Sequence, residues 1–391
     1  MDSWKKNLIV IWICQFVAMI GMSAIVPFLP LFVRELGVTN LEETAYWSGL
    51  VFAGPFFISF FLAPVWGNLG DKYGRKMMTV RAILGLAIAQ VLVGLSQNVT
   101  QLFLARLVQG LLSGFLPAAM ALVAANTPRE KTGYALGLLQ SATAGGTVLG
   151  PLLGGLISDL TGFRSVFFIV AGLLIVTGIT VILFVEEDKS SREKSEYSFI
   201  DNWKYFLRNQ KLLYPAIMIM LTAFAISYIR PTFVLYIETF SISSKFLPTI
   251  TGALYSIVGI FSLISAAWWG RRVEKSGVAK NVIYASMLTG AMYAAHSLVY
   301  DIYLLIPIRV LLGFGYGALQ PLLFTVISNN VSVERKGGVL GVGSSFQILG
   351  NMIGPVLGGF SAGYLGLRIS FAITALLFIS ITIISILKIK E

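Results

Sequence analysis

The polar stretch GNLGDKYGRK at residues 67–76 separates two apolar runs. Its three glycines allow a tight turn, and its three cations mark the side of a membrane on which positive charge is retained. The flanking runs, at 46–66 and 78–97, match the roughly 20 residues that a membrane-spanning helix needs. The stretch therefore predicts a short loop between two membrane helices.

The same alternation of apolar runs and short polar stretches covers the whole chain. Of the 391 residues, 56% are hydrophobic and 12% are charged, whereas soluble proteins have roughly 25% charged residues. This composition excludes a soluble globular protein and a disordered chain. It predicts an all-α integral membrane protein with twelve transmembrane helices, at 8–33, 46–66, 78–97, 101–124, 134–158, 165–185, 212–237, 248–269, 281–300, 302–328, 337–362 and 368–388.

The twelve runs form two sets of six that repeat one another at an offset of 203 to 204 residues. The matched pairs include Trp66 with Trp269, Arg106 with Arg309, Gly150 with Gly354, and Pro151 with Pro355. We therefore predict two pseudo-symmetric six-helix halves, at 1–185 and 212–391, joined by a linker at 186–211. Two parallel halves of this kind are the plan of transporters that rock around a central site.

The linker carries apolar residues at helical spacing beside positive charges. The apolar residues are Phe199, Ile200, Trp203, Phe206 and Leu207, and the cations are Lys204, Arg208 and Lys211. This pattern predicts an amphipathic helix. Two interpretations remain open, since the helix can lie on the membrane surface or pack on the cytosolic ends of the spans.

Lysines and arginines concentrate in alternate loops. With the N-terminus inside, 21 of the 29 lie in cytosolic segments, 4 lie outside and 4 lie within spans. The positive-inside rule therefore predicts that both termini are cytosolic. It also explains the net charge of +11 without a nucleic-acid partner. The run at 8–33 is too long for a signal peptide, so we expect it to be retained as the first span.

Few residues are suited to catalysis or metal binding. Cys14 is the one cysteine and His296 the one histidine, which excludes an intrachain disulfide, a four-thiolate metal site and an H-E-x-x-H metal site. Residues 359–363 spell G-x-S-x-G, but late in a predicted span and without a strand-to-helix turn. No Gly-Lys dipeptide occurs, so there is no P-loop for ATP. We expect no catalytic residue, no metal, no cofactor and no enzyme, with an ion or solute gradient as the energy source.

Three motifs resemble those of a known family. Residues 67–76 closely resemble the G-x-L-x-D-r-x-G-r-K pattern of the major facilitator superfamily, and RLVQG at 106–110 resembles its fourth-span R-x-x-q-G element. GTVLGPLLGG at 146–155 resembles its antiporter signature, g-x-x-x-G-P-x-x-G-G. Gly21, Pro27 and Pro30 are placed much as in the twelve-span drug:proton antiporters. The resemblance covers the chain and implies a multidrug exporter.

The resemblance also implies roles for two of these motifs. Gly67, Asp71, Gly74 and Arg75 are expected to form a cytosolic latch in which Asp71 caps a helix or pairs with an arginine and serves the conformational cycle. A plain topogenic loop is the alternative. Gly146, Gly150 and Gly154 share one helix face, Gly155 completes the signature, and Pro151 favours a bend. Static helix packing is the alternative for this motif.

Three arginines lie inside predicted spans, namely Arg106, Arg230 and Arg309. Such a charge costs roughly 2.5 to 3.5 kcal/mol to insert, so it is expected to face a cavity, a partner or substrate. The three are predicted to form a cationic belt, with snorkelling to the outer interface or bonding to helix ends as the alternative. Arg81 is expected to be only a snorkelling charge. No Asp or Glu lies in the middle of a span, which favours anionic, zwitterionic or neutral amphipathic cargo.

Polar residues in the spans that line the cavity of this superfamily are candidates for a large, mostly apolar pocket. With Arg230, they are Gln15, Gln140, Tyr228, Tyr255, Tyr316, Gln320, Gln347 and Asn351. The alternative for each is an interhelical hydrogen bond, and His296 is expected to be structural.

Together these features predict a monomeric, proton-coupled exporter of small amphipathic molecules in the inner membrane. A dedicated siderophore or metabolite exporter and a lipid flippase remain alternatives on the same fold.

Overall fold

The computed structural model describes residues 3–187, 199–240, 244–332 and 335–388, without the side chains of residues 63, 64, 67, 68, 71, 129, 199, 200 and 244. The described residues are mostly helical and contain no strand, which confirms the all-α class. Their contacts divide the chain into two compact units. The first comprises Met1–Val38, Gly54–Glu193 and Ser243–Ala253, and the second comprises Thr39–Ala53, Lys194–Ile242 and Leu254–Glu391.

Within the described residues, eleven helical stretches are long and apolar enough to cross a membrane. One further helix, α13 (Val278–Leu298), has the length of a span but includes polar residues such as Lys280, Asn281 and His296. In the part of the chain that is described, α13 completes the predicted set of twelve spans.

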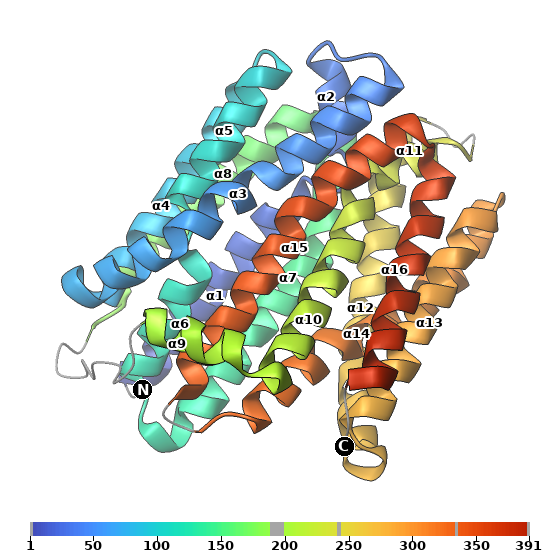
Figure 1. The fold of residues 1–391 in the computed structure, drawn as a ribbon. Coiled ribbons are helices and arrows are strands. Elements are labelled where there is room, and N and C mark those ends of the chain that lie inside the picture. Colours follow the sequence, from blue (N-terminus) through green and yellow to red (C-terminus); the bar gives the residue numbers. More distant parts are fainter. Residues whose placement is uncertain (1–2, 188–198, 241–243, 333–334, 389–391) are drawn as a thin grey trace. The chain divides into compact units, whose positions relative to one another are not determined.

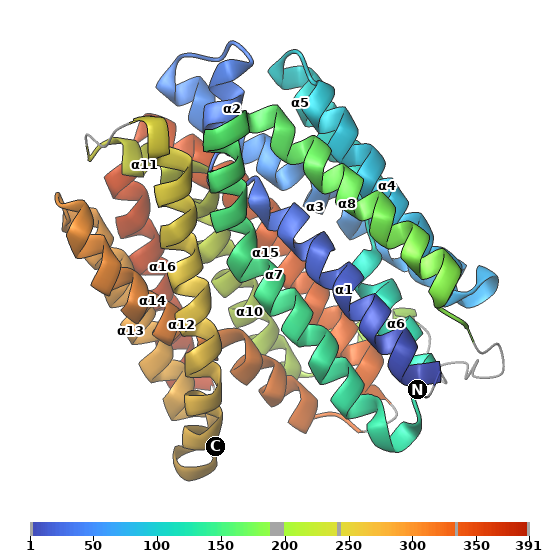
Figure 2. The same cartoon turned by 180° about the vertical axis from the view of Figure 1, so that it is seen from behind.

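The first unit contains seven whole helices and the second part of α3 (Leu41–Tyr73). They are α1 (Ser3–Ala24), α2 (Leu29–Glu35), α4 (Arg75–Leu95), α5 (Val99–Leu112), α6 (Phe115–Asn126), α7 (Thr132–Thr161) and α8 (Phe163–Phe184). The short 3-10 helices η1 (Arg129–Lys131) and η3 (Ser244–Phe246) also belong to it. Helix α1 packs along α7 and α8 (Figure 2).

The second unit contains the first part of α3 and most of α12 (Leu247–Ser276). Its other helices are α9 (Phe199–Arg208), α10 (Gln210–Ile229), the 3-10 turn η2 (Arg230–Thr232), α11 (Phe233–Glu238), α13, α14 (Ile302–Asn329), α15 (Lys336–Tyr364) and α16 (Leu367–Lys388). Helix α10 packs along α15, and α13 packs beside α16 (Figure 1).

Three predicted spans are interrupted helices. The first divides into α1 and α2, with Pro30 at the start of α2, where its missing N–H leaves no backbone bond unmade. The fourth divides into α5 and α6 at Gly114, whose φ of +107° favours glycine. The seventh divides at η2, which begins with Arg230.

The prediction of a loop across residues 67–76 is wrong. Helix α3 continues to Tyr73 and α4 begins at Arg75, so the turn is confined to Gly74, with φ +104°. Gly67 and Gly70 therefore lie within a helix, which keeps their backbone groups hydrogen-bonded. One residue at positive φ is enough to reverse the chain, and glycine adopts that conformation without steric cost.

The internal repeat is visible in matching contacts of the two units. In the first unit, Trp66 Nε1 donates a hydrogen bond to the carbonyl oxygen of Leu111 at 3.1 Å. In the second unit, Trp269 Nε1 donates to the carbonyl oxygen of Phe314 at 2.8 Å. The acceptors Leu111 and Phe314 are separated by the repeat offset, as the two tryptophans are. Equivalent residues therefore join equivalent helices in the two units.

The glycine face of α7 lies against α1, as the spacing of its glycines predicts, and this contact agrees equally with static helix packing. A Cβ atom added at Gly146 would lie 2.6 Å from the carbonyl oxygen of Phe16, and one at Gly154 would overlap the carbonyl of Ala24. Gly350, Gly354 and Gly358 of α15 meet the backbone of α10 in the same way. These positions allow backbones to approach more closely than a side chain permits.

The signature has a second face. A Cβ atom at Gly155 would overlap the carbonyl oxygen of Pro248, in the first turn of α12, and one at Gly252 would overlap that of Pro151. All four residues belong to the first unit. Gly155 therefore packs against a different helix from Gly154. Helix α7 continues without a break through Pro151.

Candidate functional site

Arg309 lies among aromatic rings of the second unit. It belongs to α14, is 5% exposed, and its guanidinium carbon lies 3.6 Å from the ring centroid of Phe233 and 5.5 Å from that of Tyr255. Its Nε atom has no hydrogen-bond partner among the described residues, and none of their carboxylates forms an ion pair with it. Ring faces partly stabilise such a cation, but no anion neutralises it within the described part of the chain.

Arg230 and Tyr255 belong to the same cluster. Arg230 begins η2, at the break between α10 and α11, and its carbonyl oxygen accepts a hydrogen bond of 3.0 Å from the Tyr255 hydroxyl. Tyr255 therefore contacts the backbone of Arg230 through its hydroxyl and lies beside the guanidinium of Arg309 through its ring. The second unit therefore holds two arginines beside one phenol, and we call Arg230, Phe233, Tyr255 and Arg309 the cationic aromatic cluster.

Arg106 occupies the equivalent position in the first unit but has a different environment. It is 5% exposed, and its Nη1 donates a 2.5 Å hydrogen bond to Gln109 Oε1, one turn further along α5. The snorkelling alternative is wrong for Arg106 and Arg309, because both side chains are buried in protein. The cationic belt that combines them remains a prediction, since the two residues belong to different units.

Several candidate cavity residues form interhelical hydrogen bonds, as the alternative expects. Tyr228 donates from its hydroxyl to Ser361 Oγ at 2.6 Å and is 4% exposed. The other pairs in the second unit are Ser227 with Asn351 at 2.5 Å and Gln347 with Gln320 at 2.7 Å. These bonds join α10 or α14 to α15, so they stabilise the helix packing whether or not cargo is present.

The remaining candidates differ in exposure. Gln15 is fully buried and donates to Thr143 Oγ1 of α7 at 2.6 Å, whereas Gln140 is exposed and Tyr316 is half-buried. Ser361, the serine of the G-x-S-x-G pattern, lies inside α15 and is 5% exposed. His296 is buried. Its Nδ1 atom is hydrogen-bonded to the Met292 carbonyl oxygen, and its ring stacks on that of Phe371. These contacts agree with a structural role.

A carboxylate from the end of the first half caps the start of α4. Glu187 Oε1 accepts a 2.7 Å hydrogen bond from the backbone N–H of Arg75, and its Oε2 accepts a 3.1 Å bond from that of Lys76. The first N–H groups of a helix lack partners within it, and the helix dipole favours an anion there. Glu187 therefore caps the first turn of α4, a role that was not predicted from the sequence.

Two asparagines hold the segment that carries Glu187. The side-chain amides of Asn7 and Asn126 donate to the carbonyl oxygen of Glu186 at 2.8 Å and 2.9 Å. Sequence reasoning treated Glu186 and Glu187 as part of a solvated linker, because their partners lie far away in the chain. Asp71 lies in the last turn of α3, and its side chain is not among those that the structure describes. The assignment of a latch to Gly67, Asp71, Gly74 and Arg75 therefore stays a prediction.

The expectation that Arg81 is only a snorkelling charge is wrong. Its Nη1 donates to the carbonyl oxygens of Leu112 and Ser113 at 3.1 Å, and its guanidinium lies 3.5 Å from the ring centroid of Trp66. Arg81 thus satisfies carbonyl groups at the end of α5 that have no partner within that helix. The break between α5 and α6 creates these acceptors, and it was not predicted from the sequence.

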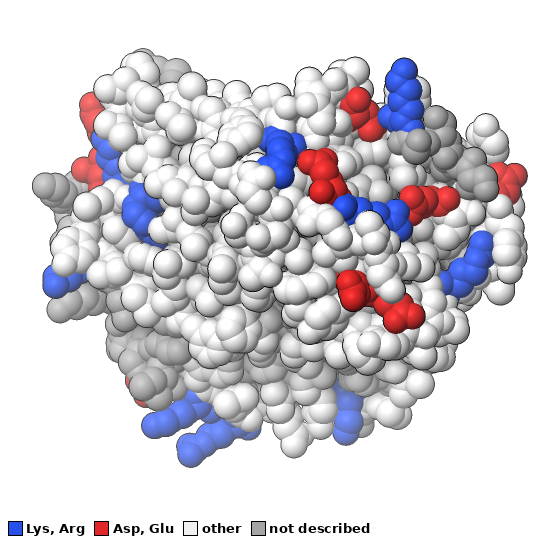
Figure 3. All heavy atoms as spheres, turned by 90° about the horizontal axis from the view of Figure 1, so that it is seen from above, with Lys and Arg blue, Asp and Glu red and all other residues white. Residues whose placement is uncertain are grey.

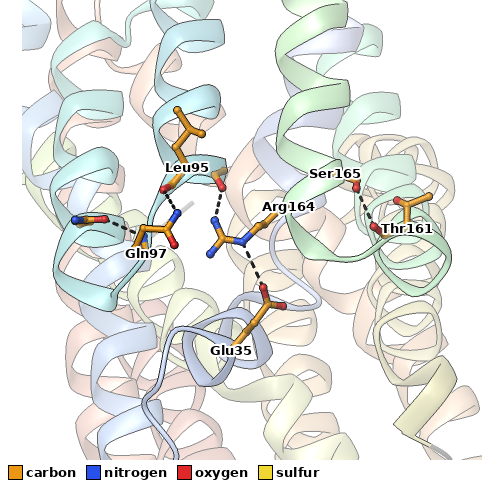
Figure 4. Close-up of polar contacts among 8 residues, drawn as sticks. Glu35, Leu95, Gln97, Thr161, Arg164 and Ser165 are labelled. Carbon is orange, nitrogen blue, oxygen red and sulfur yellow. Dashed lines mark hydrogen bonds and ion pairs between the residues drawn. The ribbon is translucent and has the colours of Figure 1, made fainter.

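Glu35, the last residue of α2, forms an ion pair with Arg164, near the start of α8. Its Oε1 lies 3.5 Å from Arg164 Nε, and Arg164 Nη1 donates to the carbonyl oxygen of Gly94 at 2.6 Å (Figure 4). In the second unit, Arg368 Nη1 donates to the carbonyl oxygen of Val299 at 2.6 Å. Arg368 is the repeat equivalent of Arg164, so in both units an arginine donates to a backbone carbonyl near the end of a helix. Figure 3 shows a face on which acidic and basic groups are interspersed among uncharged residues.

Replacing Glu187 by glutamine is expected to loosen the start of α4. Glutamine removes the negative charge and one of two acceptors, and a charged hydrogen bond contributes roughly 1.5 to 3 kcal/mol. Hydrogen exchange of the amides at 75–78 should accelerate about tenfold, while those of the α4 interior remain protected. The exposed Glu274→Gln variant is the control, and equal acceleration in both variants would contradict the cap.

Comparison with known proteins agrees with the motifs and the fold. The family model of the Major Facilitator Superfamily matches residues 11–295 and 216–391. The chain belongs to the major facilitator superfamily. Among solved structures, a bacterial homologue of the human lysosomal transporter Spinster, in an inward-facing conformation, has a TM-score of 0.81 at 15% identity and covers 99% of this chain and 97% of its own. This likeness shows that the helices adopt the major facilitator fold.

Relatives in this superfamily are similar over almost the whole chain. Multidrug resistance protein MdtG of Proteus mirabilis (strain HI4320) is 36% identical over 375 residues, which cover 96% of this chain and 93% of that protein. MdtG of Citrobacter koseri is 36% identical over 374 residues, with coverage of 95% and 92%. The likeness therefore includes both units and the segment between the two repeats.

Proposed function

We propose that this protein is a secondary active exporter of amphipathic small molecules that works by alternating access. Its similarity to proteins named for multidrug resistance, over 95% or more of the chain, supports this function. The absence of a P-loop in the sequence favours a gradient over ATP, and we propose the proton gradient as the energy source. No cofactor and no nucleic acid take part, and the monomer is the working unit.

The cationic aromatic cluster is the observation that supports a particular class of cargo. Arg309 is buried beside aromatic rings, and no described carboxylate pairs with it. A buried cation is costly unless an anion joins it, so an anionic group on an apolar molecule is a natural partner. We therefore propose that the exporter favours anionic or neutral amphipathic cargo.

The coupling proton has two candidate routes. Glu35, paired with Arg164, and Asp71 are carboxylates at span ends, and charge exchange at a buried arginine is the second route. In either case, cargo and proton bind alternately, and the cargo-free protein returns in its protonated form, so that one proton enters as cargo leaves. Resistance of a host to a panel of toxic compounds is the test of the export function.

The test uses a host that lacks its own efflux pumps. Expression of this protein is expected to raise the inhibitory concentration of several unrelated amphipathic compounds at least fourfold, and collapse of the proton gradient should abolish efflux of a fluorescent one. Protection against no compound would contradict multidrug export and would favour a dedicated metabolite exporter or a lipid flippase.

Both termini and the connecting helix α9 are proposed to lie in the cytosol, in a multi-pass inner-membrane protein. Native Cys14 is 1% exposed and is first replaced by serine. A cysteine at Lys280, near the start of α13, should then resist a membrane-impermeant maleimide in intact cells, and one at Tyr300, which is 79% exposed, should react. The reverse labelling pattern would invert the proposed orientation.

A further inference from the structure

A basic pocket of about 530 Å³ lies on the second unit beside α9. Its lining includes Lys204, Tyr205 and Arg208 from α9, Gln210 from the start of α10, and Arg335, directly before α15. Arg335 is far from the others in sequence, and its guanidinium lies 4.8 Å from the ring centroid of Tyr205. The pocket is therefore built by the fold and does not arise from a local run of charges.

Packing of α9 against α15 fixes the position of the pocket. The rings of Trp203 and Phe206 stack on Phe346 of α15, at centroid distances of 6.0 Å and 5.8 Å. Phe206 is fully buried, and α9 lies across the ends of α10 and α15 (Figure 1). This arrangement agrees with the second interpretation of the linker helix. It leaves Lys204 and Arg208 exposed on the other side of α9.

The charges of the pocket favour a ligand with an anionic phosphate group. Among the described residues, three cations and one carboxylate, that of Asp201, line the pocket, so the charge of this described lining is positive even where Asp201 pairs with one cation. Arginine guanidinium groups bind phosphate oxygens in a planar, two-pronged geometry, and a lysine adds a mobile point charge. The phenol of Tyr205 and the amide of Gln210 supply further hydrogen-bonding groups in the lining.

The position of the pocket relative to the predicted spans indicates the source of that phosphate. Gln210 is the first residue of α10, and Arg335 precedes Lys336, the first residue of α15. Both stretches that follow are long and apolar enough to span a membrane. The pocket therefore adjoins the first residues of two predicted spans, which is the region where lipid phosphates are expected. Leu207, 52% exposed on α9, provides an apolar side chain close to that region.

We propose that this pocket binds the phosphate of an anionic phospholipid headgroup beside the packed helix α9. Basic pockets at the ends of membrane helices recognise such headgroups in other proteins. The pocket adjoins the start of α10, whereas Arg230 of the cationic aromatic cluster follows the end of that helix, and the proposal does not depend on export. Binding of lipid, with no transport readout, is therefore its test.

The experiment measures lipid binding to the full-length, detergent-purified protein by native mass spectrometry. The probes are phosphatidylglycerol and phosphatidylcholine of matched acyl chains. The double variant Lys204→Gln, Arg335→Gln is expected to bind phosphatidylglycerol at least fivefold more weakly, with phosphatidylcholine unchanged. The charge-matched control is Lys211→Gln, Lys275→Gln, which alters two cations outside the pocket lining and should stay within twofold of the unmodified protein.

Equal weakening in the two double variants would overturn the pocket as the site. Glycerol phosphate, which lacks acyl chains, distinguishes the two sources of phosphate. If glycerol phosphate displaced bound phosphatidylglycerol as effectively as short-chain phosphatidylglycerol does at the same concentration, the proposal of a lipid ligand would be wrong. The ligand would then be a soluble phosphate ester. Restored binding in Lys204→Arg, Arg335→Lys, with an unchanged melting temperature in all variants, separates lost recognition from lost folding.

Discussion

Replacement of Arg309 by glutamine is expected to lower the export of anionic amphipathic compounds at least tenfold while leaving neutral compounds within about twofold. Glutamine keeps a polar side chain of moderate length but removes the charge that lies 3.6 Å from the ring of Phe233. A tenfold loss corresponds to about 1.4 kcal/mol, which is modest for a charged pair in a site shielded from water. Initial efflux rates from loaded vesicles, for cargo pairs that differ only in an ionised group, are the measurement.

Two further variants separate charge from structure at this site. Arg309→Lys retains the charge and should recover part of the export of anions, although it lacks the planar guanidinium. Arg106→Gln should also reduce anion export, because Arg106 is its repeat equivalent, but its bond to Gln109 adds a structural effect. Equal loss for anionic, neutral and cationic cargo in Arg309→Gln would identify a structural or coupling arginine. Preferential loss of cationic cargo would reverse the proposed selectivity.

Substitution of Gly154 or Gly358 by alanine is expected to destabilise the protein more than most single changes in its helices. The added Cβ would overlap the carbonyl of Ala24 in the first case and that of Tyr228 in the second. Backbone cannot move aside as a flexible side chain does, and overpacking of this kind costs about 1 to 3 kcal/mol or more. The melting temperature in detergent and the yield of monodisperse protein should both fall clearly.

The same two helices contain matched controls. A Cβ atom added at Gly137 of α7 or at Gly341 of α15 meets nothing within 4 Å. Alanine at these positions should be neutral, or stabilising by up to about 1 kcal/mol through helix propensity. A loss of stability at Gly137 or Gly341 equal to that at Gly154 or Gly358 would show that helical glycine itself, and not close packing, determines the effect.

Periodicity and repetition made much of the fold predictable. Apolar runs of span length require helices, because the backbone must satisfy its own hydrogen bonds in a membrane. The match between Trp66 and Trp269 indicated the repeat, and the spacing of the glycines at 146–154 and 350–358 indicated a helix face that a neighbour can approach closely. Both kinds of match correspond to contacts in the structure. Such features are local or repeat at one spacing, so a single sequence is enough to reveal them.

Interruptions of helices were harder to predict. The turn at Gly74 and the break at Gly114 depend on which of many glycines adopts positive φ, and packing of the adjoining helices decides that choice. The break at Gly114 leaves carbonyl groups that Arg81 satisfies, and so the role of Arg81 could not be read from a charge near a span end.

The sequence by itself determined the helical class, the repeat, the close-packing glycines and the arginines buried in spans, because hydrophobic length, spacing and charge are properties of the chain alone. Only the tertiary structure decided which polar groups meet. It brought Glu187 to the first turn of α4, Phe233 to the guanidinium of Arg309, and Arg335 to the basic pocket of α9. The partners in these contacts lie from tens of residues to more than a hundred apart, so no local pattern marks them, and they form only when the helices pack.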